Sequence, residues 1–221
     1  MQPPVETNPK RGTVLVCFAL PEEAGAFQKL AAGRPEVAIL LTGIGRQNAG
    51  RAVREFLHQN SARQVFTCGF AGGLNPELKV GDVIFSTLQR SVWDALERQG
   101  ARPAYFYCAS RIATTAAEKA ELRRKTRQDA VEMESAHIQT LCREQKIPCT
   151  TVRVISDAAQ DDLPFDFNRL CKPDLSLDFG KLAWAVAKAP GRIPALWRLR
   201  KHTNLAAQRL AGVLGKVIWP E

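Results

Sequence analysis

Two short stretches constrain this chain most, because each joins a buried-strand pattern to acidic side chains. Residues 130–135 read Ala-Val-Glu-Met-Glu-Ser, which puts two carboxylates around a methionine where an extended segment gives way to a helix. Residues 152–157 read Val-Arg-Val-Ile-Ser-Asp, a β-branched run typical of a buried strand that ends in an acid. Open α/β sheets bind ligands beyond the carboxyl ends of their strands. The pattern therefore predicts an α/β fold with a ligand site at these strand ends.

Strand and helix patterns alternate along the rest of the chain. Strand patterns cover residues 13–20, 36–42, 64–68, 80–85, 104–110 and 149–156, and helix patterns cover 46–58, 115–126 and 134–145. This alternation predicts a three-layer αβα sandwich. With 221 residues and 45% hydrophobic content, the chain can bury one good core. We expect a flexible tail at residues 1–12, one domain at 13–180, and a basic amphipathic extension of that domain at 181–221.

The composition argues against metalloproteins, secreted proteins and integral membrane proteins. Six cysteines are scattered without a C-x-x-C pair, as expected of reduced thiols in a cytosolic protein. The three histidines lie too far apart to give metal-ligand spacing. The first residues lack the apolar segment of a signal peptide, and no apolar run approaches the roughly 20 residues of a membrane span. These features predict a cytoplasmic protein without a metal.

The positive charge of the chain is concentrated near its C-terminus. Residues 181–220 hold eight of the 31 Lys and Arg residues and no acid, and Glu221 is the one acid that follows them. Residues 1–180 therefore carry 23 basic and 21 acidic side chains, so this part of the chain is almost neutral. Apolar residues recur at helical spacing from Leu196 onwards, with Trp197 and Trp219 at the two ends. This helix either packs on the domain with a solvated basic face or lies on a membrane surface. A nucleic-acid patch is the third alternative, but no reader motif accompanies the charge, so we expect no nucleic-acid partner.

The paired acids of residues 130–135 suit a sugar diol. An ionised carboxylate only accepts hydrogen bonds, so it matches the neighbouring 2′ and 3′ hydroxyls of ribose. Glu132 and Glu134 can diverge across a strand-to-helix turn, so that one faces a ligand while the other caps the helix. The alternative is that both are ordinary acids at a helix start, where the helix dipole favours negative charge.

These motifs resemble, in order, those of the superfamily of purine nucleoside phosphorylases and methylthioadenosine/S-adenosylhomocysteine nucleosidases. Besides the two stretches already described, the matching segments are Ala-Leu-Pro-Glu-Glu at 19–23, Thr-Gly-Ile-Gly at 42–45, and Gly-Phe-Ala-Gly-Gly-Leu at 69–74 before Val-Gly-Asp at 80–82. The resemblance covers roughly residues 13 to 170, and five ordered matches are more specific than any one of them. Within the superfamily, residues 116–119 and the basic extension are most similar to the nucleoside phosphorylase-like proteins of hopanoid biosynthesis.

The resemblance implies roles for individual residues. Glu23 matches the base that activates water, and Asp157 matches the acid that donates to N7 of the departing purine. Glu134 corresponds to the ribose ligand, with Met133 on the sugar face and Glu132 in support. Phe70, Ala71, Gly72 and Ser156 are the remaining candidate substrate contacts. Without the resemblance, Glu23 is equally an exposed acid of the first helix and Asp157 a helix N-cap.

The nucleophile stays open between water and phosphate. Gly45 and Arg46 could bind phosphate, because a glycine turn at a helix start approaches an anion closely. However, the sequence Thr-Cys-Gly-Phe at 67–70 lacks the Arg and Ser of the bacterial phosphorylases that it resembles, and Phe70 replaces a Ser of the nucleosidases. The connection Ser86–Arg102 is shorter than the one that encloses the 5′ substituent in the nucleosidases. It predicts an open 5′ end or a disordered loop.

We therefore predict an enzyme that cleaves the N-glycosidic bond of a purine nucleoside or a 5′-substituted adenosine and releases adenine. The resemblance names adenosylhopane, a lipid-linked nucleoside, as a possible substrate, with peripheral membrane contact through the C-terminal helix. A phosphate-dependent phosphorylase is the first alternative, with phosphate as co-substrate. A non-catalytic nucleoside-binding or membrane-tethering module is the second. No cofactor is implied, and a homodimer or larger homo-oligomer is expected.

Overall fold

The computed structural model describes residues 12–172 and 174–220. Of the predicted N-terminal tail, only Gly12 falls within the described residues. The strands are β1 (Thr13–Phe18), β2 (Val37–Leu41), β3 (Ala62–Gly73), β4 (Val83–Ser86), β5 (Arg102–Pro103), β6 (Phe106–Cys108), β7 (Ala130–Glu132) and β8 (Cys149–Asp157). They form a mixed sheet in the order β2-β1-β3-β8-β4-β5, and β7 pairs with both β3 and β6. Because β2, β1, β3 and β8 are parallel, their carboxyl ends meet at one edge of the sheet.

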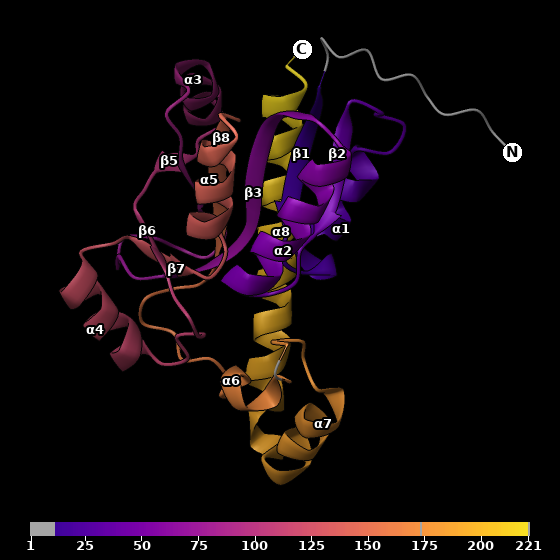
Figure 1. The fold of residues 1–221 in the computed structure, drawn as a ribbon. Helices are drawn as coiled ribbons and strands as arrows, with labels where there is room; N and C mark the ends of the chain where they lie inside the picture. Colours follow the sequence, from indigo (N-terminus) through magenta and orange to yellow (C-terminus); the bar gives the residue numbers. More distant parts are fainter. Residues whose placement is uncertain (1–11, 173, 221) are drawn as a thin grey trace, which may run out of the picture.

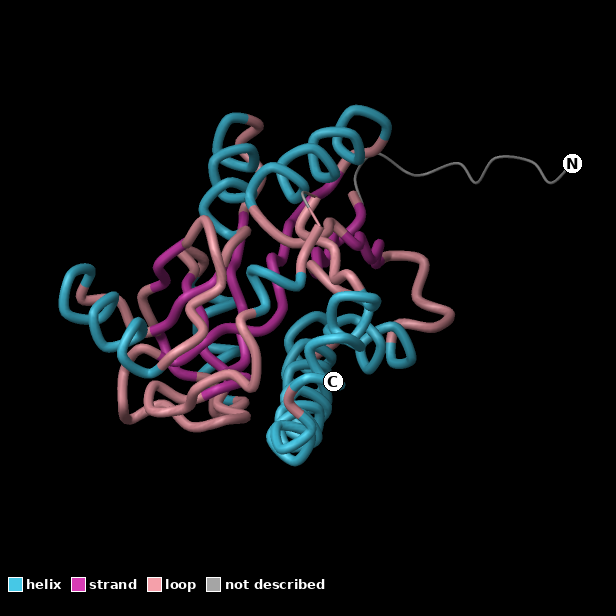
Figure 2. The backbone as a smooth tube through the Cα atoms, turned by 90° about the horizontal axis from the view of Figure 1, so that it is seen from below, coloured by secondary structure: helices cyan, strands magenta, loops and turns pink. Residues whose placement is uncertain are grey.

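Helices cover both faces of the sheet, which confirms the predicted sandwich (Figures 1 and 2). The helices are α1 (Pro21–Leu30), α2 (Arg46–Gln59), α3 (Arg90–Arg98), α4 (Ala116–Thr126), α5 (Ser135–Glu144), α6 (Phe167–Leu170), α7 (Phe179–Lys188), the 3-10 turn η1 (Pro190–Arg192) and α8 (Ile193–Ile218). On one face, Val16 of β1 and Val154 of β8 pack with Phe27 of α1 and Leu210 of α8. On the other face, Leu15 of β1 joins side chains of α2 and α5. The alternation of strand side chains thus builds two apolar layers.

Strand β3 is longer than its sequence pattern predicts. The sequence pattern ends this strand at Cys68, just before Gly69, but the strand continues to Gly73. Its second half is paired in parallel with β8 from Cys68 to Gly72, and Gly72–Gly73 also pairs with β7. Glycine usually weakens a strand. The backbone hydrogen bonds to β8 and β7 therefore maintain this part of β3 as a strand. The glycines therefore belong to the sheet and bring its backbone against the ligand site.

The C-terminal extension is divided between the core and an arm that protrudes from the domain. In α8, the side chains of Ala206, Leu210, Ala211 and Leu214 are buried, and Trp219 stacks on Phe27 with ring centroids 5.6 Å apart. The second half of α8 is therefore part of the domain core, as one of the sequence alternatives predicts. The sequence pattern did not reveal α7. We call α7, η1 and residues 193–205 of α8 the basic arm; it lies at the lower end of the molecule in Figure 1.

The connection Ser86–Arg102 is not the disordered loop of one sequence alternative. It contains α3, whose Leu96 is fully buried, and Trp93 packs edge-on against Phe85 with ring centroids 5.1 Å apart. In Figure 1, α3 lies at the opposite end of the molecule from α6 and α7.

In the part of the chain that the structure describes, no helix is long and apolar enough to cross a membrane. The six cysteines are free thiols, and Cys17, Cys68 and Cys142 are buried.

Candidate active site

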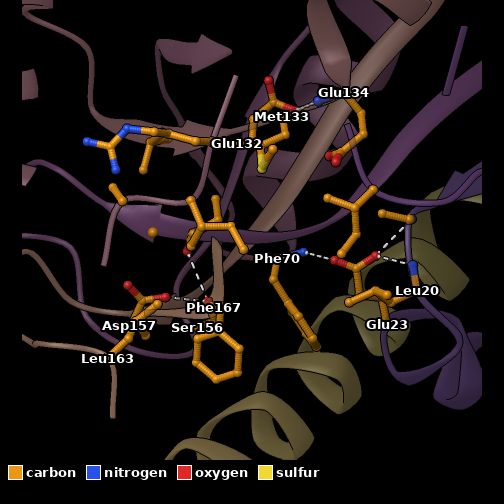
Figure 3. A pocket seen from close by; sticks show the side chains of 18 of the residues that line it. Leu20, Glu23, Phe70, Glu132, Met133, Glu134, Ser156, Asp157, Leu163 and Phe167 are labelled. Atoms are coloured by element: carbon orange, nitrogen blue, oxygen red, sulfur yellow. Dashed lines mark hydrogen bonds between the residues drawn. The ribbon is translucent and has the colours of Figure 1, made fainter. Parts of the chain in front are cut away.

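A pocket opens at the edge of the sheet where β1, β3 and β8 end. It is lined by residues that follow or end these strands, by the β7–α5 junction, and by side chains from α6 and α8. Every predicted catalytic and substrate-contacting residue lies here: Glu23, Phe70, Ala71, Gly72, Glu132, Met133, Glu134, Ser156 and Asp157. The prediction that distant motifs converge on one site at the strand ends agrees with this geometry (Figure 3).

Glu23 is a buried carboxylate held by backbone donors, not the exposed helix acid of the alternative interpretation. It is 4% exposed. Its Oε2 accepts hydrogen bonds from the N–H groups of Ala19 (2.9 Å) and Leu20 (3.0 Å), and its Oε1 accepts one from Phe70 (2.7 Å). Burial raises the pKa of Glu23, against the lowering effects of Arg153 and these donors. A fixed carboxylate with a raised pKa is suited to take a proton near neutral pH.

Glu132 and Glu134 do diverge across the turn, as the sequence predicts. Glu132 Oε2 accepts from the N–H groups of Glu134 (3.0 Å) and Ser135 (2.8 Å) and from Nη2 of Arg153 (2.6 Å), and its Oε1 accepts from the Ser135 hydroxyl. Burial opposes the ionisation of Glu132, but Arg153 and the backbone donors outweigh it and lower its pKa. Its side chain is fully enclosed. Glu132 therefore supports the strand-to-helix turn.

Glu134 keeps more of its hydrogen-bonding capacity for a ligand. Its Oε1 accepts from the backbone N–H of Gly45 (2.9 Å), and its Oε2 lies 3.2 Å from Nη2 of Arg153. Burial raises its pKa to about 7, with a further contribution from the neighbouring carboxylates. Each carboxylate oxygen has more than one acceptor position, so both can still accept from hydroxyl groups. Figure 3 shows the Glu134 carboxylate beside Met133 and above Phe70.

Asp157 lies across the pocket from Glu23, with Phe70 between them in Figure 3. It is the last residue of β8, so it is not a helix N-cap. Its Oδ1 accepts a hydrogen bond from the Ser156 hydroxyl (2.7 Å), and its Oδ2 forms an ion pair with Nζ of Lys119 from α4. Lys119 is fully buried. Local sequence does not indicate this pairing, because a lysine in a polar helix is usually a surface residue.

Gly45 and Arg46 stand apart from the other predicted site residues. The Gly45 N–H is already donated to Glu134, and both residues line a neighbouring cavity instead of the pocket that contains Glu23. Arg46 is exposed. Among the described pocket-lining residues the one cation is Arg111, which is largely exposed and paired with Glu118. A phosphate placed near Glu23 would therefore meet buried carboxylates, which repel it.

The pocket is also lined by residues that the sequence analysis missed. They are Arg111, Ile112, Ala113, Leu163, Phe167 and Leu199. Leu199 belongs to the basic arm, and Arg192 of the arm donates to the carbonyl oxygen of Pro164 (2.8 Å), next to Leu163. These residues lie on connections and on α8, far from any motif in sequence. Only the fold brings them to the opening.

Comparison with known proteins relates the whole chain to one family. The sequence signature of the Phosphorylase superfamily matches residues 20–108 and 96–188. The aminodeoxyfutalosine nucleosidase of Campylobacter jejuni is 25% identical over 167 residues, covering 60% of this chain and 72% of the relative. The 5′-methylthioadenosine/S-adenosylhomocysteine nucleosidase of Glaesserella parasuis is 28% identical over 167 residues, covering 60% and 73%.

Solved structures show the same fold. The crystal structure of the Campylobacter jejuni 5′-methylthioadenosine/S-adenosylhomocysteine nucleosidase superposes with a TM-score of 0.70 at 16% identity, covering 94% of this chain and 98% of the other. The futalosine hydrolase of Helicobacter pylori gives 0.72 at 14% identity, covering 96% and 99%. The chain belongs to the phosphorylase superfamily. The predicted family and the predicted class of enzyme, one that cleaves N-glycosyl bonds, are confirmed at that level.

Proposed function

We propose that this chain hydrolyses the N-glycosidic bond of a purine nucleoside, a 5′-substituted adenosine in particular, and releases adenine. The observation that carries the proposal is that Glu23, Glu134 and Asp157 line one pocket, with Glu23 and Asp157 on opposite sides of Phe70. Cleavage of this bond builds positive charge on the sugar and negative charge on the base. A carboxylate beside the sugar and a proton donor at the base therefore both lower the barrier.

The proposed roles follow from the contacts of each side chain. Glu23, held by three backbone N–H groups, takes a proton from the water that attacks C1′. Glu134 accepts hydrogen bonds from the ribose hydroxyls, and Met133 packs on the sugar. Asp157, fixed by Ser156, assists departure of the purine through N7. Phe70, Ala71 and Gly72 form the wall against which the base lies.

Water is favoured over phosphate by the charges of the pocket. Glu23 and Glu134 are buried there, and Arg153, the buried cation beside them, donates to Glu132, Glu134, Thr67 and the Cys68 carbonyl oxygen. Such a site offers an incoming phosphate dianion little compensation for desolvation. The phosphorylase alternative predicts adenine release that depends on phosphate. The binding-module alternative predicts no release at all. Incubating the pure chain with 5′-methylthioadenosine and adenosine, with and without phosphate, separates the three.

The size of the pocket and its surroundings bear on the 5′ substituent. The cavity holds about 220 Å³, less than the roughly 300–1,000 Å³ of typical small-molecule sites. A large 5′ group would therefore extend past the opening, towards Leu199 and the basic arm. We propose that this group is a lipid. Adenosylhopane, implied by the resemblance to hopanoid-pathway proteins, fits that description.

The basic arm has the composition of a surface that docks on anionic lipid. Its exposed apolar side chains include Phe179 (74% exposed), Trp184 (62%) and Trp197 (63%). Residues 179–205 hold six Lys and Arg residues and no acid, and each cation near an anionic surface contributes about 1 kcal/mol. Lys188 lies over the Trp184 ring, 3.6 Å from its centroid, so aromatic and cationic groups share one surface. Trp219 is excluded as an anchor, because it stacks on Phe27 and donates to Glu36.

Co-sedimentation with phosphatidylglycerol vesicles at low salt tests the docking. A truncation before Lys181 is unsuitable, because it would remove the core residues of α8. We expect the wild type to sediment, the double substitution Trp184→Ser and Trp197→Ser to lose most binding, and the control Leu88→Ser, at a fully exposed leucine outside the arm, to bind like the wild type. Equal sedimentation of all three proteins, or of none, would refute a membrane role for the arm.

Location and assembly complete the proposal. A chain that docks in this way would work in the cytoplasm at the inner membrane surface.

We also propose at least a homodimer, since closed homo-oligomers are common among soluble enzymes. Light scattering after gel filtration at several protein concentrations measures the assembly, and a monomer mass throughout would contradict the dimer.

A further inference from the structure

Lys119 is a buried cation whose one side-chain partner in the described structure is Asp157. The residue is 0% exposed, and its Nζ donates to the carbonyl oxygens of Ala158 and Asp161, both at 2.9 Å, in addition to the Asp157 carboxylate. An ammonium group has three donors, so each of them has an acceptor here. Burying a charged lysine is costly unless it is paired in this way, so its place beside Asp157 calls for an explanation.

The geometry keeps Lys119 behind Asp157. Asp157 lines the pocket, whereas Lys119 is absent from the described lining and comes from the first turns of α4. Gly72 leaves room for the Asp157 carboxylate, because a Cβ atom there would lie 3.2 Å from Oδ2, closer than ordinary contact. The side chain therefore has no direct route to a ligand except through the Asp157 carboxylate.

We propose that Lys119 is the proton source of the leaving-group acid, a positioning residue that acts through Asp157; this rests on the proposed function. The Lys119 ammonium is the N–H donor group that contacts the Asp157 carboxylate from behind the pocket. When the C1′–N9 bond breaks, its electron pair moves onto the purine and N7 becomes basic. N7 then takes a proton from the Asp157 carboxyl, which Lys119 supplies from its N–H across the Oδ2 contact.

The protons balance over one turnover. Water adds to C1′ and loses one proton to Glu23, while the purine leaves with one proton gained from the Lys119–Asp157 pair. After adenine leaves, solvent accepts the proton of Glu23 and returns one proton to Lys119 through the Asp157 carboxylate. The alternative role for Lys119 is purely structural, a tie between α4 and residues 158–161.

A comparison of leaving groups tests the proton source. The substrates are 5′-methylthioadenosine, whose adenine needs a proton to depart, and 4-nitrophenyl β-D-riboside, whose nitrophenolate does not. In the full chain, Lys119→Met should slow adenine release by about 10²-fold or more and change nitrophenolate release by less than about threefold. Lys119→Arg keeps the charge but cannot release a proton, so it should show the same selective loss. Lys125→Met, at an exposed lysine of the same helix, is the control.

The outcomes separate the two proposals. A Lys119→Arg chain that releases adenine at the wild-type rate would overturn the proton source, and so would parallel loss on both substrates in both variants, which is the result of a structural tie. Nitrophenolate release itself shows that the variant has kept its pocket, whatever its stability. Failure of the proposed function gives a different result: the wild type releases no adenine from any nucleoside tested.

Discussion

Replacing Gly69 by alanine would place a methyl group against the side chains of Glu23, the proposed base, and Arg153. Gly69 lies in β3 with φ of +145°, a backbone conformation that side chains rarely adopt. A Cβ atom at this position would lie 2.6 Å from Oε1 of Glu23 and 2.6 Å from Nη1 of Arg153. Both neighbours are buried and hydrogen-bonded, so neither can move without losing partners.

The size of the effect follows from these distances. Ordinary contact begins at 3.4 Å, so Glu23 Oε1 has to retreat by about 0.8 Å, which breaks its 2.7 Å hydrogen bond from the Phe70 N–H. A misplacement of about 1 Å can reduce turnover about 10²-fold. Overpacking costs about 1–3 kcal/mol, and a sparsely populated backbone conformation costs about 1–3 kcal/mol more. We expect Gly69→Ala to lose about 10²-fold in kcat and about 2–6 kcal/mol in the free energy of unfolding.

The assay measures adenine release from 5′-methylthioadenosine together with urea unfolding. Two glycines are matched controls. A Cβ at Gly25, in α1 two residues from Glu23, meets nothing within 4 Å, and one at Gly73 in β3 comes no closer than 3.4 Å. Gly25→Ala should be slightly more stable, by up to about 1 kcal/mol, because alanine favours a helix. Both controls should retain activity within about twofold. If Gly69→Ala had the wild-type kcat, turnover would not depend on the precise position of Glu23, and the reasoning would be refuted.

Three further predictions concern the opposite wall and the sugar contact. Asp157→Asn should retain the fold and nucleoside binding but lose about 10²–10⁴-fold in kcat, because an amide cannot pass a proton to the base; near wild-type turnover would remove Asp157 from the mechanism. Glu134→Gln should weaken discrimination against 2′- and 3′-deoxy substrates, since an amide accepts through one oxygen only; unchanged discrimination in kcat/KM would exclude Glu134 as the diol partner. Burial raises the pKa of Glu134 to about 7, so this carboxylate gains a proton as the pH falls through that value. Because the protonated group accepts fewer hydrogen bonds, the preference in kcat/KM for adenosine over 3′-deoxyadenosine should decline from pH 8 to pH 5.5. A preference that is constant over that range would contradict the role.

Much of the fold could be predicted because its strands are buried on both faces. Runs such as Val152–Ile155 read as continuous β-branched segments, and their boundaries agree with β8 to within about a residue. The extension of β3 through its glycines was missed for a physical reason. Glycine predicts a turn from local sequence, whereas the strand is maintained here by pairing with β8 and β7, which come later in the chain.

The candidate site shows the same division between local and distant information. Glu23, Glu134 and Asp157 stand in segments whose order and spacing are specific, so their convergence was predictable. Lys119 and Leu199 are unremarkable helix residues in sequence, and only the packing of α4 and α8 brings them to Asp157 and to the pocket mouth. Likewise, the amphipathic pattern after Leu196 could not show which half of α8 enters the core, because both halves carry apolar residues at helical spacing.

Hydrolysis of 5′-methylthioadenosine in ¹⁸O-labelled water tests the central claim most directly. The products are separated, and the mass of the released sugar is measured in phosphate-free buffer and again with added phosphate. We predict free adenine together with a sugar that carries one ¹⁸O atom at C1′, at a rate that phosphate does not change. A sugar 1-phosphate formed only when phosphate is present, or no adenine in either buffer, would contradict the account.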